Sequence, residues 1–134
     1  MFTDEEIACL GSQRLARLAT VASDGQPAVD AVGFQFDGER FFIGGHMLAR
    51  SRTYRNIAAG NPLVAPIIDD LAAVDPWTPR GIEVHGTAEI VARAGMFGPG
   101  EYFAIAPRVT WSWGDVAPAF ATGVAPHRIV WPAR

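Results

Sequence analysis

The sequence predicts a mostly β domain, a small antiparallel β-barrel with short helices at its periphery. Two Asp-Gly pairs, Asp24-Gly25 and Asp37-Gly38, each stand between apolar or alternating segments. Asp-Gly is a strong hairpin signal because both central residues of the favoured turn need positive φ. Several short segments alternate apolar and polar residues, and only two short segments have a helical pattern. Short antiparallel strands with few helices are typical of barrels.

The first expected element is a short helix within FTDEEIACLG, residues 2–11. Thr3 can cap its N-terminus, and Glu6, three residues later, can complete a capping box. Gly11 suits the end of the helix because glycine readily leaves the helical conformation. We therefore expect a single short helix before the first strand.

Three antiparallel strands are expected next, at about 15–22, 27–36 and 39–44, joined by the two Asp-Gly turns. Apolar residues take alternate positions in the second of these strands, which predicts one buried face: Val32, Phe34 and Phe36.

A helix over about 51–59 follows, and Gly60-Asn61-Pro62 ends it. A fourth strand is expected in LVAPIIDD, where Pro66 implies an edge position or a bulge because proline lacks an N–H. LAAVDPWTPRG has the composition of a loop, and GIEVHGTAEIV is the most regular strand in the chain. Two further strands are expected, around 101–113 and within HRIVWP.

Composition narrows the function classes. A chain of 134 residues fits one domain, expected over 1–134, and its net charge of −3 argues against nucleic-acid or membrane-surface binding. All eleven basic residues are arginine, which excludes Schiff-base chemistry on a lysine. Cys9 is the only cysteine and the three histidines are scattered, so we expect neither a disulfide nor a metal site. No signal peptide or membrane-spanning segment is visible, and we expect a cytoplasmic protein.

A cluster of arginines opens the second helix. Arg50, Arg52 and Arg55 lie near its N-terminus, where the helix dipole makes cations unfavourable. Together with the hydroxyls of Ser51 and Thr53 and the free N–H groups of the first turn, they are suited to binding a phosphate. The alternative is a solvated helix face whose arginines pair with carboxylates such as Asp69 and Asp70.

Four tryptophans are many for a barrel of this size. Trp111 and Trp113 are two residues apart, which places both on one face of a strand. Large aromatic side chains at a surface are typical of interfaces and of pockets for flat rings, although packing in the core is an alternative for each of them. His85, on the polar face of its strand, is expected to be a surface residue.

Several segments, in their order, resemble the pyridoxamine 5′-phosphate oxidase-like split β-barrel proteins: RLATVASDGQPAVDAVGF, FFIGG, SRTYRN, NPLVAPIIDD, DPWTPRGIEVHGTAEI and IAPRVTWSWG. The resemblance covers about residues 1–114 and is nearest to the branch that uses coenzyme F420, a deazaflavin. It implies an antiparallel split β-barrel and a homodimer with two equivalent cofactor sites at the subunit interface.

The resemblance also implies positions for the cofactor. Its phosphate is held in the family by a segment after the third strand, matched here by Ser51, Arg52 and Thr53, with Arg50 and Arg55 beside them. Family members often have lysine where this chain has Thr53. The flavin-like ring lies against two strands, and further aromatic residues complete the pocket from either subunit; the matching residues are Val32, Gly33, Ile43, Gly44, Trp77 and Trp113.

By this resemblance the protein is expected to be a reductase that uses reduced coenzyme F420 on an activated double bond of a small organic substrate. An FMN-binding oxidoreductase, a non-catalytic binder of a flavin-like cofactor and an interaction module with a decayed site are the alternatives. The cofactor carries the chemistry, so no catalytic residue is assigned. Tyr54, Tyr102, His46 or water could supply a proton, and Arg80, Arg93 and Arg108 are candidates for a groove that binds the acidic tail of the cofactor.

Overall fold

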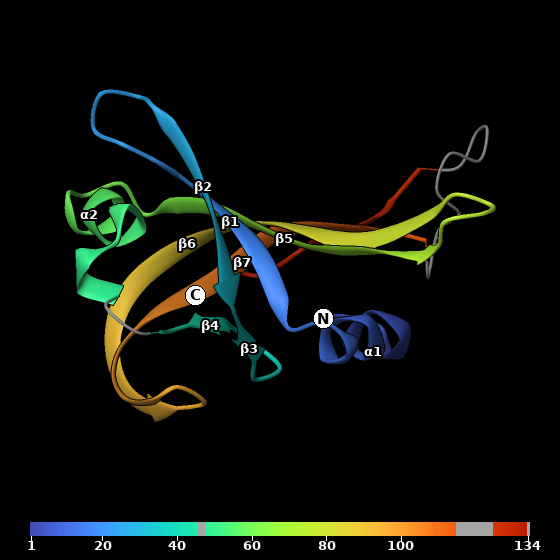
Figure 1. The fold of residues 1–134 in the computed structure, drawn as a ribbon, viewed down its shortest axis with the longest axis horizontal. Coiled ribbons are helices and arrows are strands. Elements are labelled where there is room, and N and C mark those ends of the chain that lie inside the picture. The colour runs from blue at the N-terminus through green and yellow to red at the C-terminus, as the bar shows by residue number, and fades with distance from the viewer. Residues whose placement is uncertain (46–47, 115–124, 134) are drawn as a thin grey trace.

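A computed structural model describes residues 1–45, 48–114 and 125–133 (Figure 1). The elements in these residues are α1 (Asp4–Ser12), β1 (Leu15–Val21), β2 (Pro27–Gly33), β3 (Gln35–Phe36), β4 (Phe41–Ile43), the 3₁₀ helix η1 (Leu48–Arg50), α2 (Arg52–Ala58), β5 (Leu63–Ala73), β6 (Thr78–Gly95), β7 (Gly98–Trp113) and β8 (His127–Val130). No helix in these ranges is long and apolar enough to cross a membrane.

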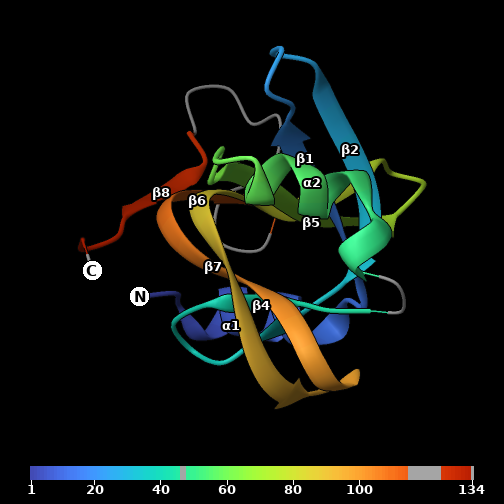
Figure 2. The ribbon, with the colours of Figure 1, turned by 90° about the vertical axis from the view of Figure 1, so that its left-hand side faces the viewer.

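All strand pairs are antiparallel, in the order β2-β1-β5-β6-β7-β4-β3, with β8 added beside β7. β2 and β3 lie at opposite ends of this order, yet only Phe34 separates them in the sequence. The sheet must therefore curl until its two edges meet at Phe34, which closes the barrel (Figure 2). The predicted mostly β, antiparallel split-barrel fold is confirmed.

Phe34 corrects the prediction of one strand over 27–36. The segment divides at this buried residue, because β2 pairs with β1 while β3 pairs with β4 on the other edge. Both Asp-Gly hairpins form as predicted, β1–β2 and β3–β4. The strand expected at 39–44 is shorter, Phe41–Ile43, because the Asp37 carboxylate accepts hydrogen bonds from the N–H groups of Glu39 and Arg40 and extends the turn.

The segment expected to be a loop, 71–81, is instead the end of the β5–β6 hairpin, and strand pairing resumes from Ala73 and Thr78. Pro66 is not in an edge strand, since β5 lies between β1 and β6. Pro66 pairs with Leu18 of β1. Between β5 and β6, the pairing stops after Val64 and resumes at Ile67, so Pro66 has no partner in β6. Because the pairing of β5 with β6 is interrupted at Pro66, the missing N–H of proline is tolerated there.

The core fills the barrel with side chains from most strands; the largest that are fully buried include Leu18, Phe41, Ile43, Ile68, Phe103 and Ile105. The two α-helices lie at opposite ends of the molecule, α2 against β1, β2 and β6, and α1 beneath the half of the sheet that ends in the β5–β6 hairpin (Figure 1).

A buried carboxylate docks α1. The predicted capping box forms, with Glu6 accepting from the Thr3 N–H and the Glu6 N–H donating to the Thr3 hydroxyl. The Glu6 side chain continues inward, where it accepts from the Ser112 hydroxyl and contacts His127 Nδ1 at 3.3 Å. Burial alone would raise the pKa of Glu6, but these hydrogen bonds outweigh it and hold the pKa below its ordinary value.

Candidate functional site

A hollow of about 430 Å³ opens between β2, the end of β4 and the start of α2, and we call it the α2 hollow. Its volume lies within the roughly 300–1,000 Å³ typical of small-molecule sites. Six of the eleven predicted site residues line it, from three separate segments of the chain: Val32, Gly33, Ile43, Gly44, Ser51 and Thr53. The fold therefore gathers the strand residues and the helix residues that the sequence assigned to one cofactor.

Two hydrogen bonds between polar side chains fix α2 over this hollow. Thr53, which is buried, donates its hydroxyl hydrogen to Asp30 Oδ2 of β2 at 2.6 Å, and Asn56 Nδ2 donates to the Thr20 hydroxyl of β1 at 2.9 Å. The Tyr54 ring also approaches that of Phe103. The start of the helix is thus held against β1 and β2, beside the wall of the hollow.

The two hydroxyls at the start of α2 already donate their hydrogens within the protein. Ser51, the N-cap, accepts from the Tyr54 N–H at 3.0 Å and donates to the Leu48 carbonyl at 2.7 Å. Thr53 donates to Asp30, which also lines the hollow. A phosphate bound here would therefore rely on arginines and backbone N–H groups, with a carboxylate close by.

The three arginines of this segment are exposed. Arg55 Nη1 donates to the Arg50 carbonyl at 3.1 Å, whereas the guanidinium groups of Arg50 and Arg52 make no ion pair or hydrogen bond with the residues described. The alternative that these arginines pair with Asp69 and Asp70 is wrong. Those two carboxylates bind arginines at the other end of the molecule.

Two predicted glycines admit aromatic rings from the β6–β7 hairpin. A Cβ added to Gly33 would lie 2.6 Å from Phe97 Cζ. A Cβ added to Gly44 would overlap the ring of Tyr102, and this ring is itself buried. Both glycines line the hollow, and at both positions the absence of a side chain lets an aromatic ring of the same chain pack against the backbone.

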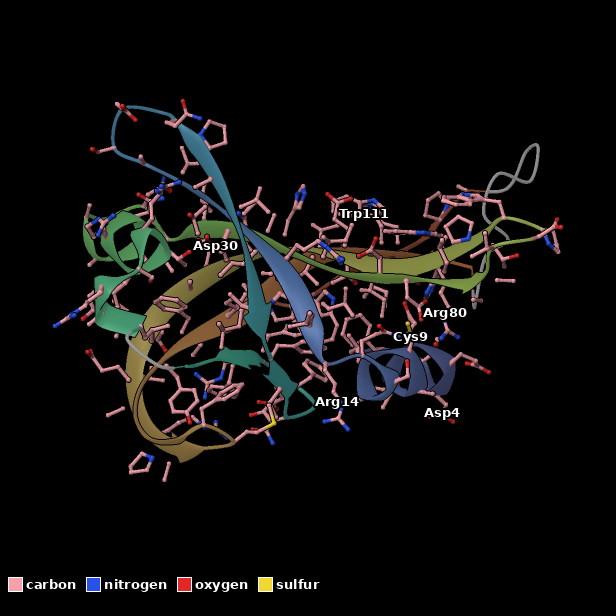
Figure 3. The ribbon with its side chains drawn as sticks, in the orientation of Figure 1. Asp4, Cys9, Arg14, Asp30, Arg80 and Trp111 are labelled. Atoms are coloured by element: carbon pink, nitrogen blue, oxygen red, sulfur yellow. The ribbon has the colours of Figure 1, made fainter. Side chains whose placement is uncertain are left out.

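Trp77 and Trp113 are not brought to the hollow within this chain. Trp77 is 61% exposed in the turn of the β5–β6 hairpin, and Trp113 pairs with Gly81 at the start of β6. Figure 1 shows this hairpin at the opposite end of the molecule from α2. Trp111 lies on the outer face of the same region beside His85, which is exposed as predicted (Figure 3).

Neither tyrosine considered as a proton donor lines the α2 hollow. The Tyr102 hydroxyl is committed to the β6–β7 turn, where it donates to the Gly98 carbonyl and accepts from the Phe97 N–H. The Tyr54 hydroxyl donates to the Glu101 carboxylate at 3.2 Å. Loss of solvation and the adjacent Glu101 raise the pKa of Tyr54, which makes its proton harder to remove. His46 lies outside the described residues.

The arginines suggested for an acidic tail do not form one groove in this chain. Arg80 and Arg93 stand at opposite ends of β6, thirteen residues apart, which corresponds to a strand path of about 40 Å. Arg80 binds Asp70 through two hydrogen bonds, and the Arg93 guanidinium lies 3.7 Å from the centre of the Phe42 ring.

Asp30 and Phe97 are site residues that sequence reasoning missed. The sequence contains an indication for Asp30, because this polar residue occupies the same face of β2 as Ala28 and Val32, where the alternation predicts an apolar residue. The sequence contains no such indication for Phe97, since only the pairing of Gly95 with Gly98 places this turn residue against Gly33.

The closed antiparallel barrel defines a split-barrel protein, and sequence comparison identifies the family. The family described as Pyridoxamine 5′-phosphate oxidase matches residues 2–122, and the chain belongs to it. A curated relative from Streptomyces rimosus subsp. rimosus, 5a,11a-dehydrotetracycline/5a,11a-dehydrooxytetracycline reductase, is 37% identical over 129 residues, covering 92% of this chain and 89% of the relative. The protein is thus a member of an oxidoreductase family.

Solved structures confirm the fold. An F420 reductase is 25% identical with a TM-score of 0.63, covering 81% of this chain and 98% of that one. HutZ, the heme storage protein of Vibrio cholerae, is 20% identical with a TM-score of 0.61, covering 80% of this chain and 91% of that one. At that identity the second likeness concerns the fold alone.

Proposed function

We propose that this protein is a reductase that uses reduced coenzyme F420 to reduce an activated double bond of a small organic substrate. The observation that carries the proposal is the convergence of six predicted cofactor residues on one hollow, in a chain 37% identical to a reductase. The relative's name describes a dehydro compound, and reduction of such a compound adds hydrogen across a carbon–carbon double bond. The same site could take FMN, because both cofactors carry a flat ring and a phosphate.

The residues of the hollow fit such a cofactor. Gly45 lines the hollow with no atom within 4 Å of the position of its missing Cβ, so a flat ring can approach the backbone there. Arg52, exposed and without a partner among the described residues, follows Ser51 at the mouth and would bind the phosphate. The bound cofactor supplies a hydride to the electron-poor carbon. Since neither tyrosine lines the hollow, His46 and water are the remaining candidates for the accompanying proton in this proposal.

The cofactor site would be completed by a second copy of the chain. The outer face of the sheet carries large apolar side chains in adjacent strands: Ile67 of β5, Trp111 and Trp113 of β7, and the 62% exposed Val130 of β8. Burial of these side chains would favour dimerisation. Trp77 and Trp113 would then approach the hollow of the partner subunit, which no single chain achieves.

Titration of the purified protein with F420 and with FMN tests the proposal. We expect micromolar binding of F420, weaker binding of FMN, and oxidation of the reduced deazaflavin in the presence of an activated alkene. A sedimentation measurement should give a dimer. A protein that binds neither cofactor at micromolar concentration would overturn the proposed function.

A further inference from the structure

A second hollow, larger and more apolar, adjoins the first. It measures about 770 Å³ and lies between the end of α1, the β2–β3 junction and the tip of the β6–β7 hairpin; we call it the α1 hollow. The two hollows share Gly33 and Phe97 in their linings. The Phe97 ring, packed on Gly33, is therefore the partition between them.

Hydrogen bonds to Tyr102 fix the backbone on either side of the Phe97 partition. Tyr102 accepts a hydrogen bond from the Phe97 N–H at 3.0 Å and donates to the Gly98 carbonyl, which fixes the backbone of the hairpin tip. The side chain of Phe97 is 45% exposed, so its ring can turn without breaking these bonds. Contact between molecules in the two hollows thus requires only a side-chain movement.

The walls of the α1 hollow are suited to carbon rings. Four large apolar side chains around it are exposed, Ile7 at 42%, Leu15 at 56%, Met96 at 56% and Phe97 at 45%. Exposed apolar side chains scattered singly are normal in soluble proteins, whereas several gathered around one concavity indicate a binding surface. A largely apolar molecule with more than one ring would cover them.

One cation faces this apolar surface. Arg14 lines the hollow between α1 and β3, and its guanidinium forms no ion pair or hydrogen bond with any residue in the described ranges (Figure 3). Two carboxylates that line a neighbouring hollow together with Arg14 are already paired, Asp69 with Arg17 and Asp70 with Arg80. A ligand with oxygen atoms along one edge would supply the missing partner for Arg14.

We propose that the α1 hollow binds the electron-accepting substrate, a largely apolar molecule of several rings with an oxygen-bearing edge directed at Arg14. This inference rests on the proposed function, because hydride transfer requires the acceptor to adjoin the cofactor at about 3–3.5 Å. The α1 hollow meets that requirement through Gly33 and Phe97. When the reduced double bond is conjugated with a carbonyl group, hydride addition places negative charge on the carbonyl oxygen as an enolate, and Arg14 would stabilise that charge.

Gly11 offers a way to fill the hollow without disturbing the fold. It lies in α1 and lines the hollow, its φ is not positive, and a Cβ built on it meets nothing within 4 Å. Gly11→Trp therefore adds a large side chain to the binding space. Ala8→Trp is the matched control, because Ala8 is an exposed residue of the same helix outside the hollow. Ile7→Arg, a charge added to the wall at a half-exposed position, is a second blocking variant.

The probes are alizarin, a hydroxyanthraquinone with oxygens along one edge, and anthracene, the same three rings without oxygens. Binding is measured by fluorescence on the full chain, without cofactor and then with F420 bound. Gly11→Trp and Ile7→Arg should each weaken both probes at least tenfold, and Ala8→Trp should change neither more than twofold. Arg14→Gln should weaken alizarin about tenfold and leave anthracene unchanged. F420 affinity should stay the same in all four variants.

The inference and the proposed function fail in different ways. Wild-type affinity for alizarin in Gly11→Trp and Ile7→Arg, no binding of either probe to the wild type, or competition between alizarin and F420 would each overturn the assignment of the α1 hollow. Absence of F420 and FMN binding overturns the proposed function instead. Binding of the two probes is measured on the cofactor-free chain, so its result does not depend on whether the chain binds a cofactor.

Discussion

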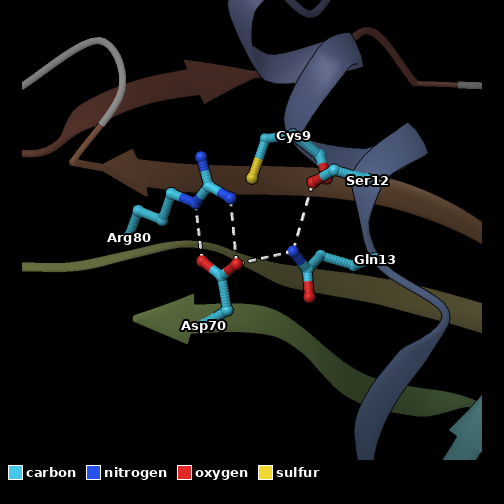
Figure 4. A network of polar contacts seen from close by, with 5 residues as sticks. All are labelled: Cys9, Ser12, Gln13, Asp70 and Arg80. Atoms are coloured by element: carbon cyan, nitrogen blue, oxygen red, sulfur yellow. Dashed lines mark hydrogen bonds and ion pairs between the residues drawn. The ribbon is translucent and has the colours of Figure 1, made fainter. Parts of the chain in front are cut away.

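Arg80 beside α1 and the arginines at the start of α2 differ in whether a carboxylate of the chain binds them. At the α1 end, Arg80 binds Asp70 through two hydrogen bonds of 2.6 and 2.9 Å, and Gln13 joins the same carboxylate (Figure 4). At the α2 end, Arg50 and Arg52 have no carboxylate partner among the described residues, and the Asp30 carboxylate accepts from Thr53 instead. Arginines paired within the chain tie elements together, whereas arginines without such a partner are available to a ligand.

The largest effect is expected at the α1 end, on stability. Glu6→Ala removes a buried carboxylate and leaves the Ser112 hydroxyl and the Thr3 N–H without an acceptor, which should cost about 3 kcal/mol of unfolding free energy. Urea unfolding measures it. Asp4→Ala, an exposed acid in the same helix, is the control and should cost less than about 1 kcal/mol. Equal losses in the two variants would contradict a role for the buried contacts.

The second effect separates the two kinds of arginine. Arg52→Ala should weaken F420 binding by about 1–3 kcal/mol, the range for a charge-assisted hydrogen bond, with little change in stability. Arg17→Ala should leave the affinity unchanged and cost less than about 1 kcal/mol of stability, because its pair with Asp69 is half exposed. Arg55→Ala should fall between Arg52→Ala and no effect, since its guanidinium already donates to the Arg50 carbonyl. Fluorescence titration of the three variants compares them, and equal affinities would remove the distinction.

Acid should destabilise the fold, in part through two carboxyl groups at the α1 end. Burial would raise the pKa of Glu6, but its hydrogen bonds lower it below the ordinary 4.5, and the hydrogen bond from Arg80 lowers the pKa of Asp70 below 3.8. Carboxyls whose pKa is lower in the folded state stabilise it above their unfolded pKa, and this contribution is lost as pH falls through the folded value. The melting temperature should therefore decline below about pH 4.5, and less so in Asp70→Asn. A melting temperature independent of pH between 5 and 2.5 would be inconsistent with these shifts.

The smallest effect tests the carboxylate in the α2 hollow. Asp30→Asn removes a negative charge near the proposed phosphate position, while the amide oxygen can still accept from the Thr53 hydroxyl. F420 should bind about threefold more tightly, because the repulsion between a partly solvated carboxylate and a phosphate is modest. The same titration measures it, with Asp24→Asn in the distant β1–β2 turn as control. Weaker binding in Asp30→Asn would show that the carboxylate supports the site.

Local patterns predicted the elements well where the determining contacts are near in sequence. The capping box of Thr3 and Glu6, the two Asp-Gly hairpins and the start of α2 at Ser51 all depend on residues within about four positions of one another. The composition of residues 71–81 predicts a loop, whereas Leu71 and Ala73 of β5 pair with Pro79 and Thr78 of β6 and extend the hairpin nearly to its tip.

The predicted site residues also differ in whether the fold of one chain brings them to the hollow. Six of the residues that the resemblance implies line one hollow, Val32, Gly33, Ile43, Gly44, Ser51 and Thr53, and their role in binding a cofactor stays a prediction. No local pattern indicates that residues twenty positions apart in the sequence meet. Trp77 and Trp113 remain a prediction that depends on a second copy of the chain. The partners of Thr53 and Phe97, namely Asp30 and Gly33, follow from strand register and could not be read from spacing.

By itself the sequence determined the mostly β class, the hairpin turns and the arginine-rich start of α2, because each depends on backbone preferences and charges that neighbours along the chain share. Only the tertiary structure decided which arginines have carboxylate partners, which glycines admit an aromatic ring and that two hollows meet at Phe97. These features depend on strand register and on closure of the barrel, which bring together residues whose distance in sequence carries no information about their contact.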